Sequence, residues 1–230
     1  MKKIQRIASW AGGMLLALSA GEAFAFTQID TMTGWNGTDT IQPFGIANTA
    51  TYGQVVTAPP GETTLSSFSF EMNIPATVAF RGEVYAWDGV NSRASGAALY
   101  ESAPMQTAGT GFQVITFTIP AGVPVVPGQQ YVIFATNTRD QAGHSGSGPW
   151  AARYTDVYPG GTFVYLNNGT DPTQWTTVPW SAFSSFDGAF RATFGGAAPV
   201  PTPPLSEYTM MLVTVLLALT GFVFLRRRGN

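Results

Sequence analysis

The stretch FQVITFTI, residues 112–119, alternates in a way that recurs along most of the chain. Successive side chains of a β-strand point to opposite faces, so its residues fall into two sets. One set mixes apolar and hydroxyl side chains and consists of Phe112, Val114, Thr116 and Thr118. The other set begins with Gln113 and is otherwise apolar, with Ile115, Phe117 and Ile119. We predict a half-buried strand whose second set faces the core.

Similar short runs, rich in Val, Phe, Tyr and Thr, lie between turn residues from residue 26 to residue 194. They are TYGQVVTA (51–58), TLSSFSFEM (64–72), TVAFRGEVYAW (77–87), AALYES (97–102), QYVIFATN (130–137), GTFVYLNN (161–168) and GAFRATF (188–194). Sustained apolar spacing of the helical kind is absent from this part of the sequence. The pattern predicts an all-β fold, an antiparallel β-sandwich of the jelly-roll type.

The first 25 residues have the layout of a secretory signal peptide. Three basic residues precede an apolar stretch, and small residues follow with Ala23 and Ala25 in A-x-A register. We predict that the export machinery carries the chain across the membrane and that signal peptidase cleaves after Ala25, leaving Phe26 at the mature N-terminus. The alternative, an uncleaved anchor, is disfavoured because the apolar part is short and a cleavage site follows it.

An uncharged apolar stretch near the other end is long enough to cross a membrane. It covers residues 208–225, which at the rise of an α-helix is about 27 Å, close to the roughly 30 Å hydrocarbon core. Arg226, Arg227 and Arg228 follow where the positive-inside rule places cytoplasmic charge. We predict a single transmembrane helix with the bulk of the chain outside. A buried helix of the domain, the alternative, does not explain the arginines.

The C-terminal part resembles the IPTL-CTERM class of bacterial sorting tails, which are similar to PEP-CTERM tails. The resemblance rests on a short signature, an apolar helix and a basic end in this order, and the signature residues are Pro204, Leu205, Ser206 and Glu207. Tyr208 stands where the class usually carries Trp. The resemblance implies that an exosortase-like membrane peptidase removes or exchanges the tail in a Gram-negative-type envelope.

The body is similar to a group of uncharacterised exported bacterial β-sandwich domains that carry such tails. The stretches concerned include GQVVTAP from residue 53, VYAWDG from residue 84 and PGQQYVIF from residue 127. The expected organisation has four parts. They are a signal peptide (1–25), the β-sandwich (26–194), a Gly/Pro linker (195–204) and a sorting signal with transmembrane helix and basic tail (205–230).

Charge limits the classes of partner. Residues 26–204 contain five arginines, no lysine and eleven carboxylates, a net charge of −6. A mildly acidic surface does not neutralise phosphates, so we expect no nucleic-acid partner. The chain has no cysteine. An exported domain without disulfides depends on core packing for its stability.

The tetrapeptide NGTD occurs twice, at residues 36–39 and 168–171. Asn-Gly supplies positive φ, so both copies are most simply turns. Oxygen-rich loops also suit Ca²⁺, although no EF-hand or RTX spacing is present, and calcium stays a minor alternative. N-x-T also matches the glycosylation pattern. No other cofactor is expected.

The residue types in this sequence give little support for a catalytic site. His144 is the only histidine, and its surroundings, AGHSGSGPW, miss the last position of a G-x-S-x-G nucleophile elbow. Without Cys, and without Lys in residues 26–204, cysteine nucleophiles and Schiff bases are excluded there. Glycoside hydrolysis needs only two carboxylates. The candidates in or near predicted strands are Glu71, Glu83, Asp88 and Glu101.

Aromatic residues near predicted loops and strand ends are candidates for stacking on sugar rings. They are Trp87, Trp150, Trp175, Trp180, Tyr154 and Tyr158. We therefore expect an exported, non-catalytic envelope or matrix protein with a structural or adhesive sandwich. The alternatives are a carbohydrate-binding module that holds extracellular polysaccharide on exposed aromatics and, third, a glycosidase-like enzyme.

Overall fold

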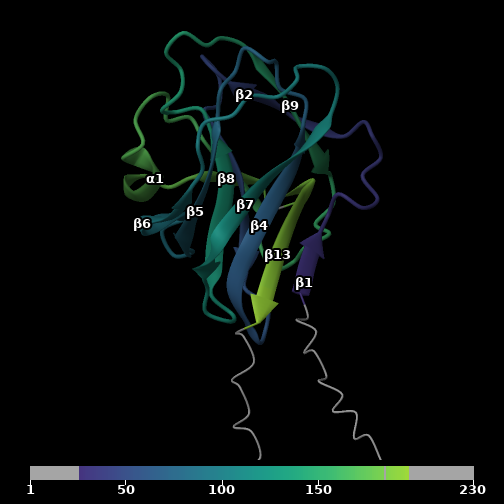
Figure 1. Cartoon of the computed structure of the whole chain (residues 1–230), viewed down its shortest axis with the longest axis vertical. Coiled ribbons are helices and arrows are strands. Elements are labelled where there is room, and N and C mark those ends of the chain that lie inside the picture. Colours follow the sequence, from purple (N-terminus) through teal and green to yellow (C-terminus); the bar gives the residue numbers. More distant parts are fainter. Residues whose placement is uncertain (1–25, 184, 197–230) are drawn as a thin grey trace, which may run out of the picture.

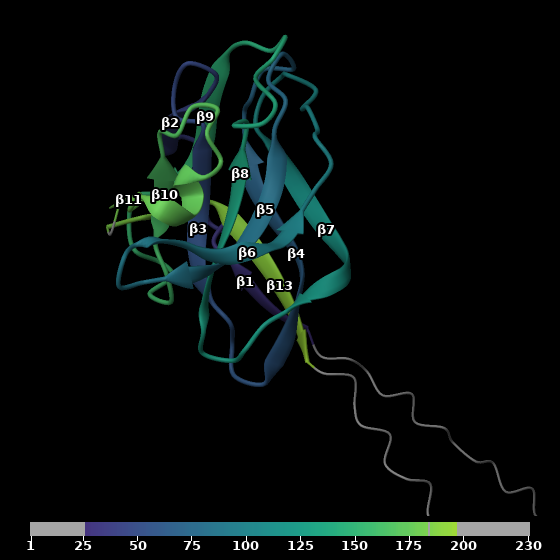
Figure 2. The ribbon, with the colours of Figure 1, turned by 90° about the vertical axis from the view of Figure 1, so that its left-hand side faces the viewer.

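Two antiparallel β-sheets pack face to face (Figures 1 and 2). The computed structural model describes residues 26–183 and 185–196. The predicted signal peptide, the linker after residue 196 and the sorting signal lie outside these residues. Within the described part, no helix is long and apolar enough to cross a membrane. The start of β1 and the end of β13 lie together at the lower end of the molecule in Figure 1.

The first sheet has β4 near its centre. Its strands are β1 (Phe26–Asp30), β13 (Phe190–Gly196), β4 (Glu62–Met72) and β7 (Gln113–Pro124), with β9 (Ser147–Arg153), β2 (Thr40–Gly45) and β12 (Asp187–Gly188) attached at the end of β4. β13 and β7 pair with opposite edges of β4, and β9 meets β4 at Met72. β9 in turn pairs with β2 and β12.

The second sheet contains six strands. In spatial order they are β11 (Ser181–Phe183), β10 (Phe163–Leu166), β3 (Thr51–Thr57), β8 (Gln130–Thr136), β5 (Arg81–Asp88) and β6 (Arg93–Glu101). The helix α1 (Gln174–Thr177) belongs to the segment that joins β10 to β11. Figure 2 shows β10 and β11 at one side of the molecule, below β2 and β9.

Each strand predicted from alternation is present, which confirms the β-sandwich. In β7 the predicted register is also correct: Phe117 is 1% exposed, whereas Val114 is 50% exposed. The prediction missed β1, β2, β9, β11 and β12. In β9 (SGPWAAR), glycine and proline interrupt the alternating pattern. Its strand conformation is stabilised instead by pairing with β2 and β12.

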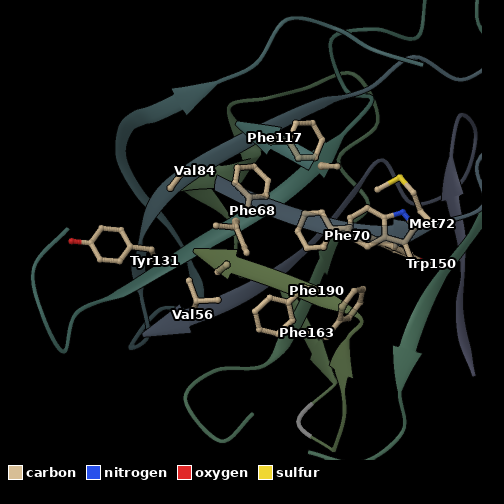
Figure 3. Close-up of a cluster of buried hydrophobic side chains, with 14 of the residues drawn as sticks. Val56, Phe68, Phe70, Met72, Val84, Phe117, Tyr131, Trp150, Phe163 and Phe190 are labelled. Atoms are coloured by element: carbon tan, nitrogen blue, oxygen red, sulfur yellow. The ribbon is translucent and has the colours of Figure 1, made fainter. Parts of the chain in front are cut away.

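The main core between the sheets is rich in aromatic rings (Figure 3). Phe68 stacks on Phe117 with 4.8 Å between ring centroids, and Phe70 lies 4.5 Å from Trp150. The close approach of the sheets depends on Gly82. A Cβ at this position would lie 2.2 Å from the Phe117 ring.

A second apolar cluster covers the outer face of the second sheet. It comprises Val55, Tyr85, Ala94, Val132, Phe134, Val164, Leu166, Trp175 and Trp180. Trp175 and Trp180 come from the segment between β10 and β11, and both rings contact Phe134 on β8. This segment therefore closes most of a face that an isolated sandwich would leave open to solvent.

Candidate functional site

Three of the four tryptophans predicted to stack on sugars are core residues. Trp150 and Trp175 are each 1% exposed and Trp180 is 4% exposed. Trp175 donates its indole N–H to Thr51 Oγ1 at 3.2 Å, and Trp180 donates to the carbonyl of Trp175 at 2.9 Å. With no ring face at the surface, these three cannot stack on a ligand, and the prediction is corrected for them. Trp87 is only partly buried.

A groove lies elsewhere, between β2 and the β10–β11 hairpin. Its volume is about 440 Å³ and it is open to solvent. The lining residues are Thr40, Ile41, Gln42, Tyr154, Phe183, Ser185 and Phe186. We call it the aromatic groove.

A stack of rings runs from the core to this groove. Phe163, fully buried on β10, stacks on Phe183 at an interplanar angle of 22°, and Phe183 lies 4.7 Å from Phe186 at 20°. Tyr165 stacks on Phe183 as well, at 5.1 Å. The stack reaches solvent because Phe183 is 37% exposed. These rings form a continuous aromatic stack from the core to the groove.

Tyr154 closes the groove on the other side. Its ring meets Phe186 edge-on at 5.6 Å and is 54% exposed. The hydroxyl donates to the carbonyl of Thr40 at 2.7 Å and accepts from the Thr40 N–H at 3.3 Å, which fixes the ring against β2. Gln42 and Ser185 add polar side chains to the lining. None of the described residues that line the groove carries a charge.

Of the groove residues, the sequence pointed only to Tyr154. Phe183 and Phe186 went unnoticed because FSSFDG reads as part of a loop before the last strand. The signal that could have indicated these two residues is their place in a short serine-rich segment. This segment has no alternating pattern, so nothing in it predicts that the two rings are buried. Tyr158 is held differently, because its hydroxyl accepts from the Thr57 N–H at 2.9 Å and its ring packs against Phe190.

Two of the carboxylates proposed for catalysis face each other. Glu83 on β5 and Glu101 on β6 are cross-strand partners. Arg139 Nη1 lies 3.1 Å from Glu83 Oε1 and 2.5 Å from Glu101 Oε2. Arg81 binds Glu101 at 2.7 Å and Asp140 at 2.8 Å. The arginine nitrogen thus occupies the space between the two carboxylates in which a glycosidic bond would have to lie.

Glu83 is fully buried, and burial raises its pKa to about 8 against the opposing effect of Arg139. Its Oε2 has no hydrogen-bond partner. The other two carboxylates lie apart from this pair. Asp88 accepts from the N–H groups of Val90 and Asn91, as a turn residue does, and Glu71 lies on β4 of the other sheet.

The two NGTD copies are turns, and both glycines have positive φ as predicted. Asn36 accepts from the N–H groups of Thr38 and Asp39, both at 2.9 Å. Asn168 is buried and donates to Thr138 Oγ1 at 3.0 Å. Across residues 26–183 and 185–196, no three His, Cys, Asp or Glu side chains are grouped to hold a metal ion.

His144 lies in a loop before β9, where its Nδ1 is 3.2 Å from the Thr77 carbonyl. It lines a small cavity with Ala79, Pro104, Met105 and Gln106. The five arginines of the described part are all bonded internally. Four pair with carboxylates, and Arg153 donates to the carbonyls of Thr31 and Thr33.

No family model matches the chain, and no curated protein matches it. Among solved structures, it is similar to a clostridial cysteine protease, Cwp84 after propeptide cleavage. The identity is 15% and the TM-score 0.48, over 75% of this chain and 40% of that one. A structure of the cysteine protease and lectin-like domains of Cwp84, a surface layer associated protein of Clostridium difficile, matches at 16% identity. There the TM-score is 0.42, over 64% of this chain and 32% of that one.

Proposed function

We propose that this chain is an exported cell-envelope protein whose β-sandwich binds neutral saccharide in the aromatic groove. The observation that carries the proposal is the solvent-exposed platform of Phe183, Phe186 and Tyr154, which is anchored to the buried Phe163. Of the functions considered from sequence, this favours the carbohydrate-binding module over a purely structural sandwich.

The chemistry of the groove fits an uncharged sugar. The C–H face of a pyranose ring is apolar and packs on an aromatic face, while its hydroxyls need polar partners at the edge. Phe183 and Tyr154 offer the rings, and Thr40, Gln42 and Ser185 offer hydroxyl and amide groups. The uncharged lining gives a polyanion nothing to pair with.

The topology supports the finer proposal that the sandwich is a jelly roll. Apart from the added strands, the sheets have the orders β1-β13-β4-β7 and β3-β8-β5-β6. These interleave in the manner of two nested Greek keys, an arrangement that many lectin domains use.

The proposal for location rests on the two ends of the sequence. We propose that residues 1–25 direct export and that the C-terminal segment holds an intermediate in the inner membrane. An exosortase-like peptidase then processes the IPTL-CTERM-like tail, and the sandwich is displayed at the cell surface or in the extracellular matrix. The proposed binding needs no cofactor and no catalytic residue. A glycosidase gains little support from Glu83 and Glu101, because Arg139 fills the space between them.

Affinity electrophoresis of the full-length chain in mild detergent tests the binding. Gels would contain hydroxyethyl cellulose, laminarin, soluble starch or galactomannan. We expect retardation in at least one of them, weakened by about tenfold in apparent affinity for Phe183→Ala or Tyr154→Ala, because a lost ring contact worth roughly 1.4 kcal/mol lowers affinity by that factor. Tyr154→Phe keeps the ring and should keep most of the retardation.

Val157→Ala is the matched control, since Val157 is 39% exposed and lies outside the groove lining. Its retardation should equal that of the unmodified chain. Equal retardation of Phe183→Ala, Tyr154→Ala and the unmodified chain would show that the groove does not hold the saccharide.

A further inference from the structure

We infer that the sandwich has a second saccharide site, around Trp87, and that the two sites face opposite sides of the β10–β11 hairpin, so that one molecule bridges two polysaccharide chains. This inference rests on the proposed function of the aromatic groove. It adds a separate site and a consequence, cross-linking, that one groove cannot produce.

The second site is a cavity of about 290 Å³ on the outer face of the second sheet. We call it the Trp87 pocket. Its walls include Trp87, Ser92, Gln130 and Thr162, and apolar residues of the lining include Val55, Val164 and Ala182. None of the described lining residues is charged, as in the aromatic groove. The shared chemistry, an aromatic ring with uncharged polar groups around it, suits the same class of ligand.

Trp87 is held in position before any ligand arrives. Its ring meets Trp180 edge-on, with 5.8 Å between centroids and an interplanar angle of 88°. The backbone N–H of Trp180 donates to the carbonyl of Ser92 at 2.7 Å. Ser92 adopts a left-handed conformation with φ of 52°, which non-glycine residues seldom adopt. Because the Trp87 side chain is already held in place, it loses less conformational entropy when a ligand binds.

Gly89 keeps the polar rim close to the ring. A Cβ there would lie 3.2 Å from Gln130 Oε1 and 3.9 Å from Trp87 Cδ1, so the amide and the indole flank the same glycine. A sugar stacked on Trp87 would therefore have an amide within reach of its hydroxyls.

The register of β11 sets the relative direction of the two sites. Phe183 pairs with Phe163, which belongs to the core between the sheets, whereas Ala182 pairs with Val164, which belongs to the outer cluster. Paired residues share a face and successive residues alternate. Phe183 lines the aromatic groove and Ala182 lines the Trp87 pocket, so the sites open on opposite faces of one short strand. A straight chain in one site leaves the other free for a second chain.

Two measurements on the full-length chain test this inference. The first is affinity electrophoresis with the neutral polysaccharide that gives the strongest retardation. The second is light scattering of that soluble polysaccharide as protein is added, which reports cross-linking. We expect Trp87→Ala and Phe183→Ala each to lower the apparent affinity measured by retardation about tenfold and to abolish the rise in scattering. The double variant should show neither retardation nor scattering.

The other variants separate loss of the Trp87 ring from a general effect on the sheet. Trp87→Phe retains a ring and should retain scattering. Leu99→Ala alters an exposed side chain of the same sheet, 43% exposed, and should change nothing. If Trp87→Ala scatters like the unmodified chain while Phe183→Ala loses retardation, the second site is refuted and the proposed function stands. If only Trp87→Ala loses retardation, the aromatic groove is refuted as the site. Absence of retardation with every polysaccharide overturns both.

Discussion

At the scale of single residues, the least expected side chain is Glu83. It is fully buried, and Arg139 lies between it and its cross-strand partner Glu101, at a position where alternation predicted only a strand residue. Two arginines and three carboxylates meet here, so a protonated Glu83 leaves this group of five without net charge. The energetic cost of burying a charge explains why neutral Glu83 is favoured.

This raised pKa makes folding stability depend on pH. The pKa of Glu83 rises from an ordinary value of 4.5 to about 8 in the folded chain. Its contribution to stability is therefore complete below the lower value and is lost as pH rises toward the upper one, at up to roughly 1.4 kcal/mol per pH unit. Urea denaturation at pH 5 and pH 8 should show a drop in unfolding free energy that is several-fold smaller for Glu83→Gln.

Glu101→Gln is the comparison for this experiment, because Glu101 is partly exposed and contacts the same arginines. It should retain the pH dependence of the unmodified chain. An identical drop in Glu83→Gln and the unmodified chain would contradict the assignment to Glu83.

At the scale of elements, the segment from β10 to β11 defines both candidate sites. Its first part places Trp175 and Trp180 over β8 and so forms the second core. Its end, β11, provides Ala182 for the Trp87 pocket and Phe183 for the aromatic groove. Arg139 stacks over the Trp175 ring at 4.9 Å and so links the segment to the buried Glu83. This connection thus contributes to both candidate sites.

Trp175→Ala should therefore lower stability strongly. Removing a large buried ring costs about 3–5 kcal/mol, whereas the partly buried Trp87 should cost less when it is replaced by Ala. Chemical denaturation of the two variants measures the difference in unfolding free energy. Similar losses for both would contradict the structural role assigned to Trp175.

At the scale of the whole molecule, the sandwich and the two ends of the sequence have different proposed roles. The described residues form a mildly acidic sandwich whose arginines are bonded internally, and the linings described for the two candidate sites are uncharged. The basic residues outside it belong to the two proposed targeting segments. Phe26 opens β1 and pairs with Gly195 on β13, so the first and last described strands meet at one end of the sandwich.

Export and tail processing should appear as defined mass losses. Intact-protein mass spectrometry of the protein recovered from the cell surface or medium should give an N-terminus at Phe26 and should lack the apolar C-terminal segment. Blocking the export signal by replacing Lys2, Lys3 and Arg6 with Asp should leave the full-length mass in the cytosol. A full-length chain at the cell surface would contradict both cleavages.

The strands and the overall class of fold could be predicted from local pattern, because alternation reflects geometry between adjacent residues. FQVITFTI needed no partner to reveal its buried face. Burial of individual aromatic residues is different, since it depends on distant contacts. Trp175 is covered because it packs on Phe134 and bonds to Thr51, and Phe183 is exposed because β11 lies at the edge of its sheet. Which rings face solvent, and in which direction, follows from how segments more than 100 residues apart come together, as Trp175 and Thr51 do.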